Sequence, residues 1–214
     1  MTIRVFLADD HAVVRYGLRL LLEAQGDIVI VGVASNGREA VHQAQRLQPD
    51  VMIVDIGMPE LNGIEAIRQI HETTPSTRVV VLSIHSTAEH VYRALQAGAL
   101  GYVLKESVGM EVVQAVRAAY AGQRYLSEKI AEEDIYGYTH RRQRESPLDS
   151  LSPREREVLQ LTVEGKSSAE IAETLFLSPK TVETYRSRLM LKLGVHDLPS
   201  LVKFAIQHGV TSLE

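Results

Sequence analysis

The first 120 residues alternate between short, wholly apolar runs and longer stretches with an apolar residue every three or four positions. The apolar runs predict β-strands at residues 4–8, 28–34, 51–55, 78–83 and 101–104. The longer stretches predict α-helices at residues 12–23, 37–47, 62–72, 88–97 and 108–120. Strands that are apolar on both faces and separated by helices indicate a parallel sheet covered on both sides. The pattern therefore predicts a doubly wound, five-stranded α/β domain over residues 1–122, with functional residues at the carboxyl ends of the strands.

The pattern changes after residue 122. Residues 123–150 have clustered charge and no sustained apolar period, which predicts a linker with room for one helix in its first half. Residues 151–214 contain the start and stop signals of four short helices, which predict a small all-α domain. The expected helix starts are Ser152 with Glu155, Ser167 with Glu170, Ser178 with Pro179, and Asp197, and the expected stops are Gly165 and Gly194.

Composition narrows the class of protein. The 214 residues have room for two domains, and 45% hydrophobic with 23% charged residues is an ordinary globular composition. The absence of cysteine excludes disulfides, thiolate metal sites and thiol catalysis. The chain has neither the pattern of a signal peptide nor an apolar run of membrane-spanning length, so we expect a cytoplasmic protein with no membrane partner.

Polar residues follow four of the predicted strands where each ends. Asp9 and Asp10 come after the first strand, Asp55 ends the third, Ser83 ends the fourth, and Lys105 follows the fifth. In a doubly wound sheet these four strands can be neighbours, which brings three carboxylates, a hydroxyl and an ammonium together. Clustered carboxylates raise one another's pKa unless a cation joins them, and Mg²⁺ prefers oxygen ligands. We expect a Mg²⁺ site there, with Asp55 as a nucleophile toward a phosphoryl group.

A structural alternative exists for each residue of this site. A single Asp at a strand end is often a helix cap, and the pair Asp9-Asp10 precedes a predicted helix. Capping does not explain five such residues together, and it gives no reason for Lys105.

These residues resemble the receiver domains of two-component response regulators over residues 2–121. The resemblance rests on Asp9-Asp10, Asp55 in D-I-G-M-P, Ser83, and both Tyr102 and Lys105 in G-Y-V-L-K. It implies phosphorylation of Asp55 by the phosphohistidine of a sensor histidine kinase, with Ser83 and Lys105 as catalytic residues. It also implies a metal held by Asp10, Asp55 and the main-chain carbonyl of Gly57, with Asp9 acting mainly through water. Ser83 and Tyr102 are the implied switch residues.

The sequence departs from many receivers in two places. Glu106 stands where many receivers have a proline in a cis bond, and a cis bond before a residue other than proline is costly. Gly57 and His85 occupy two positions that tune hydrolysis of the acyl phosphate in receivers. We hypothesise that Gly57 leaves the phosphoryl group open to water while His85 covers it.

Residues 168–176 and 179–193 have the proportions of a helix-turn-helix. One face of the second helix is apolar, and the opposite face carries Lys180, Thr184 and Ser187 between Glu183 and Arg188. Short polar side chains with basic neighbours suit the major groove of DNA, although an ordinary solvated helix face has the same pattern. A net charge of −4 argues mildly against binding of nucleic acid. Residues 178–193, however, contain four basic residues and only one acidic residue, Glu183, so the charge of this segment is positive.

Residues 151–208 resemble the four-helix DNA-binding domain of the LuxR type, through L-S-P-R-E-R-E-V-L, E-I-A-E-T-L-F-L-S-P-K-T-V-E-T-Y-R and K-L-G-V. With the receiver, this resemblance places the chain in the NarL/FixJ group. It implies base-reading positions at Glu183, Thr184 and Ser187, and phosphate contacts at Lys180, Thr181, Arg188 and Lys192. Arg186 falls toward the buried side, where an internal ion pair is expected. Residues 198–207 carry an apolar stripe that either packs in the core or forms a dimer contact, as in relatives.

The sequence thus predicts a DNA-binding transcriptional regulator of a two-component system, phosphorylated on Asp55 by a sensor histidine kinase and active as a homodimer. Double-stranded DNA is its expected partner, and RNA polymerase is a candidate. It is not expected to be an enzyme beyond its own phosphoryl transfer and autodephosphorylation. One alternative is a phosphorylation-independent regulator with a scaffold receiver. Another is a Mg²⁺-dependent phosphatase of the haloacid-dehalogenase type, which would need an acid at Gly57.

Overall fold

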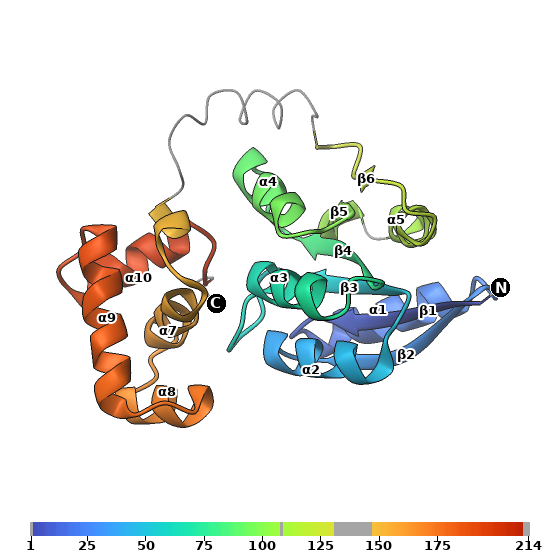
Figure 1. The fold of residues 1–214 in the computed structure, drawn as a ribbon. Helices are drawn as coiled ribbons and strands as arrows, with labels where there is room; N and C mark the ends of the chain where they lie inside the picture. The colour runs from blue at the N-terminus through green and yellow to red at the C-terminus, as the bar shows by residue number, and fades with distance from the viewer. Residues whose placement is uncertain (1, 108, 131–146, 212–214) are drawn as a thin grey trace. The chain divides into compact units, whose positions relative to one another are not determined.

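The structure is a computed structural model that describes residues 2–107, 109–130 and 147–211, and it divides into two compact units, Met1–Arg141 and Arg142–Glu214 (Figure 1). Each unit is described by itself. Within those ranges no helix is both long and apolar enough to span a lipid bilayer.

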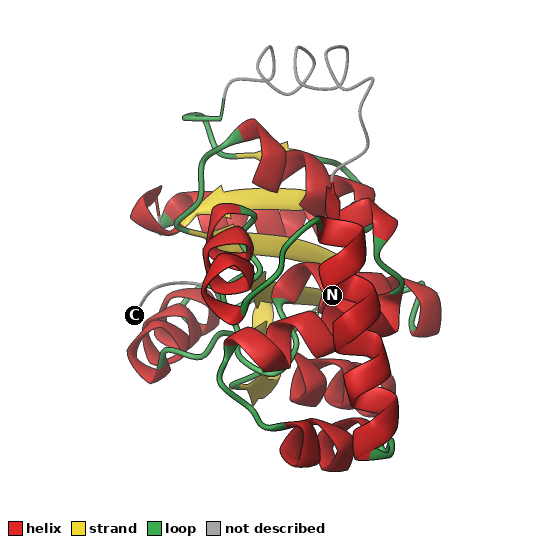
Figure 2. Cartoon of the chain, turned by 90° about the vertical axis from the view of Figure 1, so that its left-hand side faces the viewer, coloured by secondary structure: helices red, strands yellow, loops and turns green. Residues whose placement is uncertain are grey.

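The first unit is a parallel sheet with helices on both faces (Figure 2). Its strands are β1 (Ile3–Ala8), β2 (Ile28–Ala34), β3 (Val51–Asp55), β4 (Arg78–Ser83), β5 (Gly101–Leu104) and β6 (Tyr125–Leu126). Its helices are α1 (Ala12–Glu23), α2 (Gly37–Leu47), α3 (Gly63–Thr73), α4 (Ala88–Gln96), the 3₁₀ turn η1 (Lys105–Ser107) and α5 (Met110–Tyr120). The strand order is β2-β1-β3-β4-β5-β6, so β1, β3, β4 and β5 are consecutive neighbours as the sequence analysis expected.

Two hydrophobic layers enclose the sheet. Alternate strand residues such as Met52 and Val54 pack against α2, α3 and α4. The residues between them, such as Val51 and Ile53, pack against α1 and α5. Because β3 is buried on both faces, its run of apolar residues has no polar alternation, which is typical of a central parallel strand.

The predicted strands and helices are confirmed, with bounds that agree to within two residues. The sheet, however, has six strands and not the predicted five. In β6 the N–H of Tyr125 donates to the carbonyl of Leu100 at 3.1 Å, and the N–H of Ser127 donates to the carbonyl of Tyr102 at 2.9 Å. A two-residue edge strand is too short to show a hydrophobic period, which is why it was read as linker.

Both ends of the predicted linker carry secondary structure, namely β6 and the 3₁₀ turn η2 (Pro147–Ser150). Residues 123–130 of its first half contain no helix, and the middle of the linker, residues 131–146, lies outside the described residues.

The second unit contains α7 (Pro153–Val163), α8 (Ser168–Leu175), α9 (Pro179–Leu193) and α10 (Leu198–Gln207). The predicted capping boxes are present, since Ser152 and Glu155 bond reciprocally at the start of α7 and Ser167 with Glu170 does the same for α8. Val182 and Leu189 of α9 are fully buried against residues of α7, α8 and α10. Gly194 ends α9 in the left-handed conformation, at φ 67°.

Candidate functional site

Strand pairing aligns the carboxyl ends of β1, β3, β4 and β5. Asp55, the last residue of β3, pairs with Leu82 of β4, and Ser83 pairs with Leu104 of β5. Ala8 at the end of β1 pairs with Val54, so that Asp9 begins the next loop beside Asp55. Parallel pairing alone therefore brings the predicted site residues to one edge of the sheet.

Lys105 connects two buried carboxylates. Its Nζ lies 2.8 Å from Oδ2 of Asp9 and 2.9 Å from Oδ2 of Asp55. Asp9 is 2% exposed and Asp55 is 6% exposed. Burial raises the pKa of Asp55, and the charge and hydrogen bond of Lys105 oppose part of that rise. Burial works to lower the pKa of Lys105, but its two carboxylate partners outweigh it and hold that pKa above its usual value.

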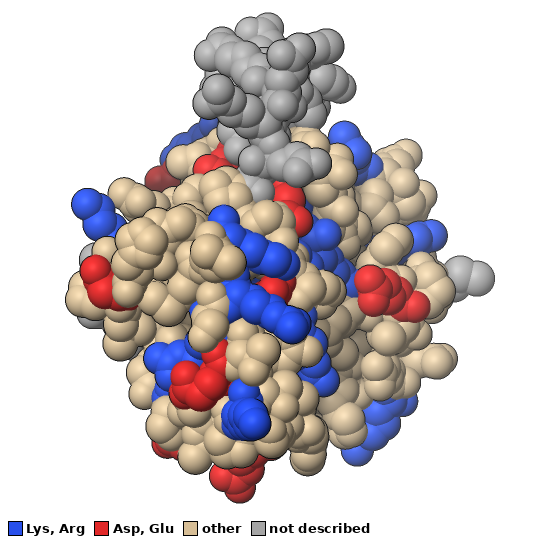
Figure 3. All heavy atoms as spheres, turned by 60° about the vertical axis from the view of Figure 1, so that its left-hand side comes forward, with Lys and Arg blue, Asp and Glu red and all other residues tan. Residues whose placement is uncertain are grey.

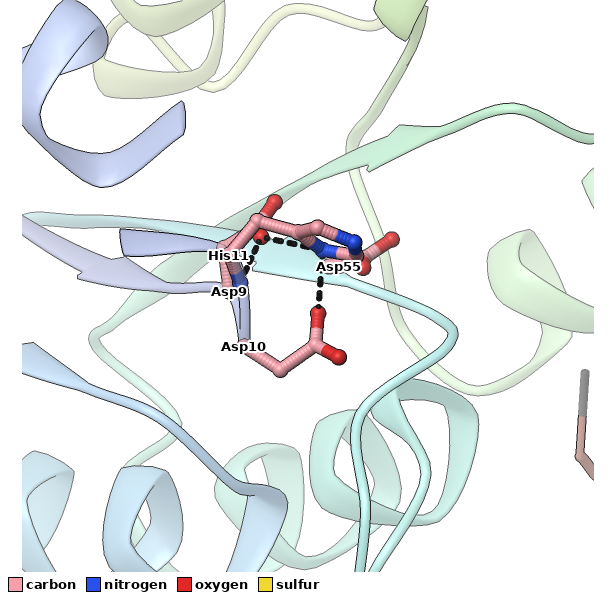
Figure 4. A group of neighbouring side chains, drawn as sticks. All are labelled: Asp9, Asp10, His11 and Asp55. Atoms are coloured by element: carbon pink, nitrogen blue, oxygen red, sulfur yellow. Dashed lines mark hydrogen bonds and ion pairs between the residues drawn. The ribbon is translucent and has the colours of Figure 1, made fainter. Parts of the chain in front are cut away.

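Asp10 and His11 complete the cluster (Figure 4). Nδ1 of His11 lies 2.7 Å from Oδ1 of Asp10 and 3.4 Å from Oδ1 of Asp9, and the main-chain N–H of His11 donates to Oδ1 of Asp9 at 2.8 Å. One side-chain donor atom from each of Asp9, Asp10, His11 and Asp55 lies within 4.8 Å of all the others. The sequence analysis missed His11, although a histidine directly after an acidic pair is a signal for a nitrogen ligand.

The acidic residues fit a divalent cation. Among the described residues, no group donates a hydrogen bond of good geometry to Asp9 Oδ2 or Asp10 Oδ1, although both oxygens are shielded from solvent. Nζ of Lys105 and Nδ1 of His11 lie at ion-pair distance from these two oxygens. The three clustered carboxylates of Asp9, Asp10 and Asp55 match the oxygen ligands that hard divalent ions take.

The loop after β3 lies close to the backbone of Asp55. The N–H of Gly63 donates to the carbonyl of Ile56 at 3.0 Å, and Asn62 caps α3 through the N–H of Glu65. A Cβ on Gly63 would lie 2.1 Å from the carbonyl oxygen of Asp55. Gly63 is therefore required by the close approach of α3 to the end of β3.

The predicted switch residues, Ser83 and Tyr102, are joined by hydrogen bonds through His85. The N–H of His85 donates to Oγ of Ser83 at 3.1 Å, and the hydroxyl of Tyr102 donates to the carbonyl of His85 at 2.6 Å. Tyr102 is fully buried, and burial raises its pKa well above the ordinary value of 10.0. The ring of His85 stacks on His90 with centroids 4.4 Å apart. Burial lowers the pKa of His85, and the charge of Asp55 opposes this.

Glu106, which stands where many receivers have a proline, lies in a 3₁₀ turn. Residues Lys105–Ser107 form η1, and the described part of the chain contains no cis peptide bond. The loop after Lys105 thus follows a trans path, as the cost of a non-prolyl cis bond favours.

Most of the predicted DNA-contacting residues are exposed on α9. Lys180, Glu183, Thr184, Ser187 and Arg188 are exposed, and Thr181 is half-buried. The hydroxyls of Thr184 and Ser187 donate to the carbonyls one turn earlier, at 3.0 and 2.9 Å, which leaves their oxygens as acceptors. On the face drawn in Figure 3, Lys and Arg side chains, in blue, are interspersed with Asp and Glu side chains, in red.

Three charged residues of α9 have partners in the second unit. Arg186 is half-buried, lies 3.6 Å from the exposed carboxylate of Glu183 on the same helix, and donates to Oγ of Ser168 at 3.0 Å, so its ion pair lies at the surface and is not internal. Ser168 also donates to Glu183. Nζ of Lys192 lies 2.7 Å from Oε2 of buried Glu155 and 3.1 Å from the carbonyl of Ser150. Lys192 therefore ties α9 to α7, and a phosphate contact from it remains a prediction.

Comparison with known proteins agrees with both units. Residues 5–117 match the response regulator receiver domain, and residues 149–205 match the bacterial regulatory proteins of the luxR family. The chain is 39% identical to the response regulator UvrY of Escherichia coli K12 over 212 residues, covering 99% of this chain and 97% of UvrY. It is 41% identical to the transcriptional regulatory protein LiaR of Bacillus subtilis over 203 residues, covering 95% and 96% of the two chains.

A solved structure gives the same assignment. The chain is 28% identical to RcsB from Salmonella enterica serovar Typhimurium, solved bound to promoter rprA in the presence of the phosphomimetic BeF₃⁻, with a TM-score of 0.63 and coverage of 95% and 98%. The chain therefore belongs to the NarL/FixJ family of two-component response regulators, DNA-binding transcriptional regulators that join a receiver domain to a LuxR-type helix-turn-helix domain.

Proposed function

We propose that phosphorylation of Asp55 in this chain controls binding of α9 to double-stranded DNA. The observation that supports this most is the ammonium of Lys105, held between Asp9 and Asp55 at the end of the sheet. A buried cation beside a nucleophilic carboxylate stabilises the negative charge that a transferring phosphoryl group carries.

The phosphoryl donor we propose is the phosphohistidine of a sensor histidine kinase. A carboxylate oxygen of Asp55 attacks phosphorus, and a P–O bond forms as the P–N bond breaks. The electron pair of the P–N bond stays on the departing imidazole, which takes up a proton. Water later attacks the acyl phosphate and returns the carboxylate, so the chain catalyses only its own modification and autodephosphorylation.

We assign the metal as Mg²⁺, held by Asp10, Asp55 and the main-chain carbonyl of Gly57, with Asp9 acting through water. When bound, the ion would neutralise charge on the phosphoryl oxygens. The cluster of carboxylates from Asp9, Asp10 and Asp55 supports this assignment.

Ser83 and Tyr102 would transmit the modification. A phosphoryl group adds up to two negative charges and three strong acceptors, which draw Ser83 and Lys105 toward Asp55. Because His85 links Ser83 to Tyr102, a shift of Ser83 reaches β5 and the surface around α4.

For DNA, we propose that Glu183, Thr184 and Ser187 read bases, and that basic residues near both ends of α9 hold phosphates. The proposed phosphate contacts are the basic residues Lys180, Arg188 and Lys192, together with the hydroxyl of Thr181. One recognition helix reads few base pairs, so a homodimer on paired half-sites is expected. An open apolar hollow on α10, lined by Leu198, Pro199, Val202 and Ile206, supports dimerisation there.

The remaining assignments follow from this function. We place the receiver at residues 1–122, the linker at 123–150 and the DNA-binding domain at 151–214. We place the protein in the cytoplasm, with RNA polymerase as a further partner.

The test is incubation of the full chain with acetyl phosphate and Mg²⁺, followed by mass spectrometry, light scattering and gel shift on selected DNA. We expect one added phosphoryl group, a dimer and tighter DNA binding, all lost in Asp55→Asn. Asp27→Asn is the matched control, because Asp27 is a surface carboxylate paired with Arg117. Equal DNA binding by Asp55→Asn and the parent would favour a scaffold receiver. Turnover of acetyl phosphate without a change in DNA binding would favour a phosphatase.

A further inference from the structure

The start of α1 does not depend on the side chain of His11. It is the N-cap residue of α1, yet its side chain makes no capping hydrogen bond. Ser, Thr, Asp and Asn are the residues that stabilise such positions, and histidine is not among them. The His11 side chain is 60% exposed, so burial does not explain it either. What remains is its contact with Asp10 and Asp9.

The imidazole nitrogen lies at ligand spacing from these carboxylates. Adjacent ligands of an octahedral ion with bonds of about 2.1 Å are about 3.0 Å apart, and opposite ligands are about 4.2 Å apart. The distances from Nδ1 of His11 to Oδ1 of Asp10 and Oδ1 of Asp9, 2.7 and 3.4 Å, fall on either side of the first value. The 4.8 Å limit that contains all four side-chain donors exceeds the second value by about half an ångström.

The direction of the side chains agrees with this spacing. Figure 4 shows the carboxylate of Asp10 and the ring of His11 pointing toward one another. Asp10 Oδ1 accepts no hydrogen bond of good geometry from the described residues, in spite of the short distance to Nδ1. The two atoms are therefore at a distance that two ligands of one ion have.

We propose that Nδ1 of His11 is a further ligand of the receiver metal, which adds affinity for Mn²⁺ and Co²⁺ but little for Mg²⁺. This inference rests on the metal site proposed above. Carboxylate, carbonyl and water ligands suit Mg²⁺, whereas an imidazole nitrogen adds affinity for first-row transition ions. His11 is thus a selectivity residue, and Asp10 and Asp55 are ligands for either class of ion.

The experiment compares the full-length parent protein with His11→Asn, and uses His42→Asn as the matched control. Asn is a favourable N-cap residue without an imidazole, so α1 is retained. His42 is an exposed histidine of the same unit on α2, and its replacement removes only a surface imidazole. Dissociation constants for Mg²⁺, Mn²⁺ and Co²⁺ are measured by calorimetry, and electron spin echo modulation of bound Mn²⁺ detects a directly coordinated ¹⁴N.

We expect ¹⁴N modulation in the parent and in His42→Asn, and none in His11→Asn. We expect His11→Asn to weaken Mn²⁺ and Co²⁺ binding by about tenfold or more, as loss of metal-supporting groups typically does, and to change Mg²⁺ binding by less than about twofold. Absence of ¹⁴N modulation in the parent, or its persistence in His11→Asn, would overturn the inference.

Asp10→Asn separates this inference from the proposed function. If Asp10→Asn weakens binding of all three ions while His11→Asn leaves every constant unchanged, the metal site stands and His11 is not a ligand. If Asp10→Asn also leaves every constant unchanged, the metal assignment itself is wrong and the inference about His11 falls with it.

Discussion

Replacement of Gly63 by alanine should disable the acceptor site without touching any charged group. The new Cβ would lie 2.1 Å from the carbonyl oxygen of Asp55, 2.8 Å from its carbonyl carbon and 2.9 Å from Cα of Ile56. All three contacts are backbone atoms, so no side-chain rotation relieves them. A carbon and an oxygen approach one another to about 3.3 Å, so α3 and the end of β3 must separate by about 1 Å.

That separation has two measurable consequences. Overpacking of this kind costs about 1–3 kcal/mol, so the receiver should melt at a lower temperature in calorimetry of the full chain. A displacement of about 1 Å at a reacting group lowers the rate by about a hundredfold. Labelling of Asp55 by acetyl phosphate and Mg²⁺, followed by mass spectrometry, should slow by that order.

Gly17→Ala is the matched control. Gly17 is an exposed residue inside α1, and a Cβ there would meet nothing within 4 Å. Because glycine inside a helix is destabilising by about 0.5–1 kcal/mol relative to alanine, this change should raise the melting temperature and leave the labelling rate unchanged. A Gly63→Ala protein that labels as fast as the parent would refute the argument that the backbone contact between α3 and β3 positions Asp55.

Three further predictions concern other parts of the chain. Phe176 is 95% exposed and lies at φ 56°, in the left-handed conformation, directly after α8. Because that conformation is costly for Phe, Phe176→Asn should stabilise the second unit by about 1 kcal/mol. A lower melting temperature of the variant would contradict this. Tyr102→Phe removes the hydrogen bond to the carbonyl of His85 and should lower the receiver's unfolding free energy by about 1 kcal/mol in urea titration, and an unchanged value would show that the bond contributes nothing. Burial works to raise the pKa of Glu155, but Lys192 and Ser152 hold that pKa below its ordinary value of 4.5. The lowered pKa stabilises the folded second unit above pH 4.5, and this stabilisation is lost as the pH falls through the lower, folded-state pKa. Lys192→Met should cost about 1 kcal/mol at pH 7 and make melting of the second unit less sensitive to acid below pH 4.5, whereas an unaltered acid profile would show that this ion pair is not responsible.

The parts of this structure that were predictable are those set by local pattern. Apolar runs fixed the central strands, and parallel pairing then required Asp9, Asp55 and Lys105 to meet, which they do. Helix starts in the second unit followed from Ser residues with Glu three positions later, because that pairing satisfies backbone groups locally.

What was not predictable depends on contacts between residues distant in sequence. β6 exists because Ser127 and Tyr125 bond to the far side of β5, and two residues carry no period that could reveal this. Lys192 resembles a free basic residue in the sequence, but it is bonded to Glu155, 37 positions earlier. The proposed role of His11 rests on the 2.7 Å distance between its ring and Asp10, which adjacency in the sequence suggests but does not fix.

The hydrogen bonds of His85 constrain how the receiver can switch. Ser83 accepts from the N–H of His85, and Tyr102 donates to the carbonyl of the same residue. If Ser83 moves toward a phosphoryl group on Asp55, as proposed above, it must either carry the His85 backbone along or break the bond between Ser83 and His85. In the first case the carbonyl of His85 moves with it, and Tyr102, fully buried beneath the loop, must follow or lose its partner. Because an unsatisfied buried hydroxyl costs about 1–3 kcal/mol, the two side chains are expected to move together and not in sequence. These two hydrogen bonds then couple Ser83 at the end of β4 to Tyr102 on β5.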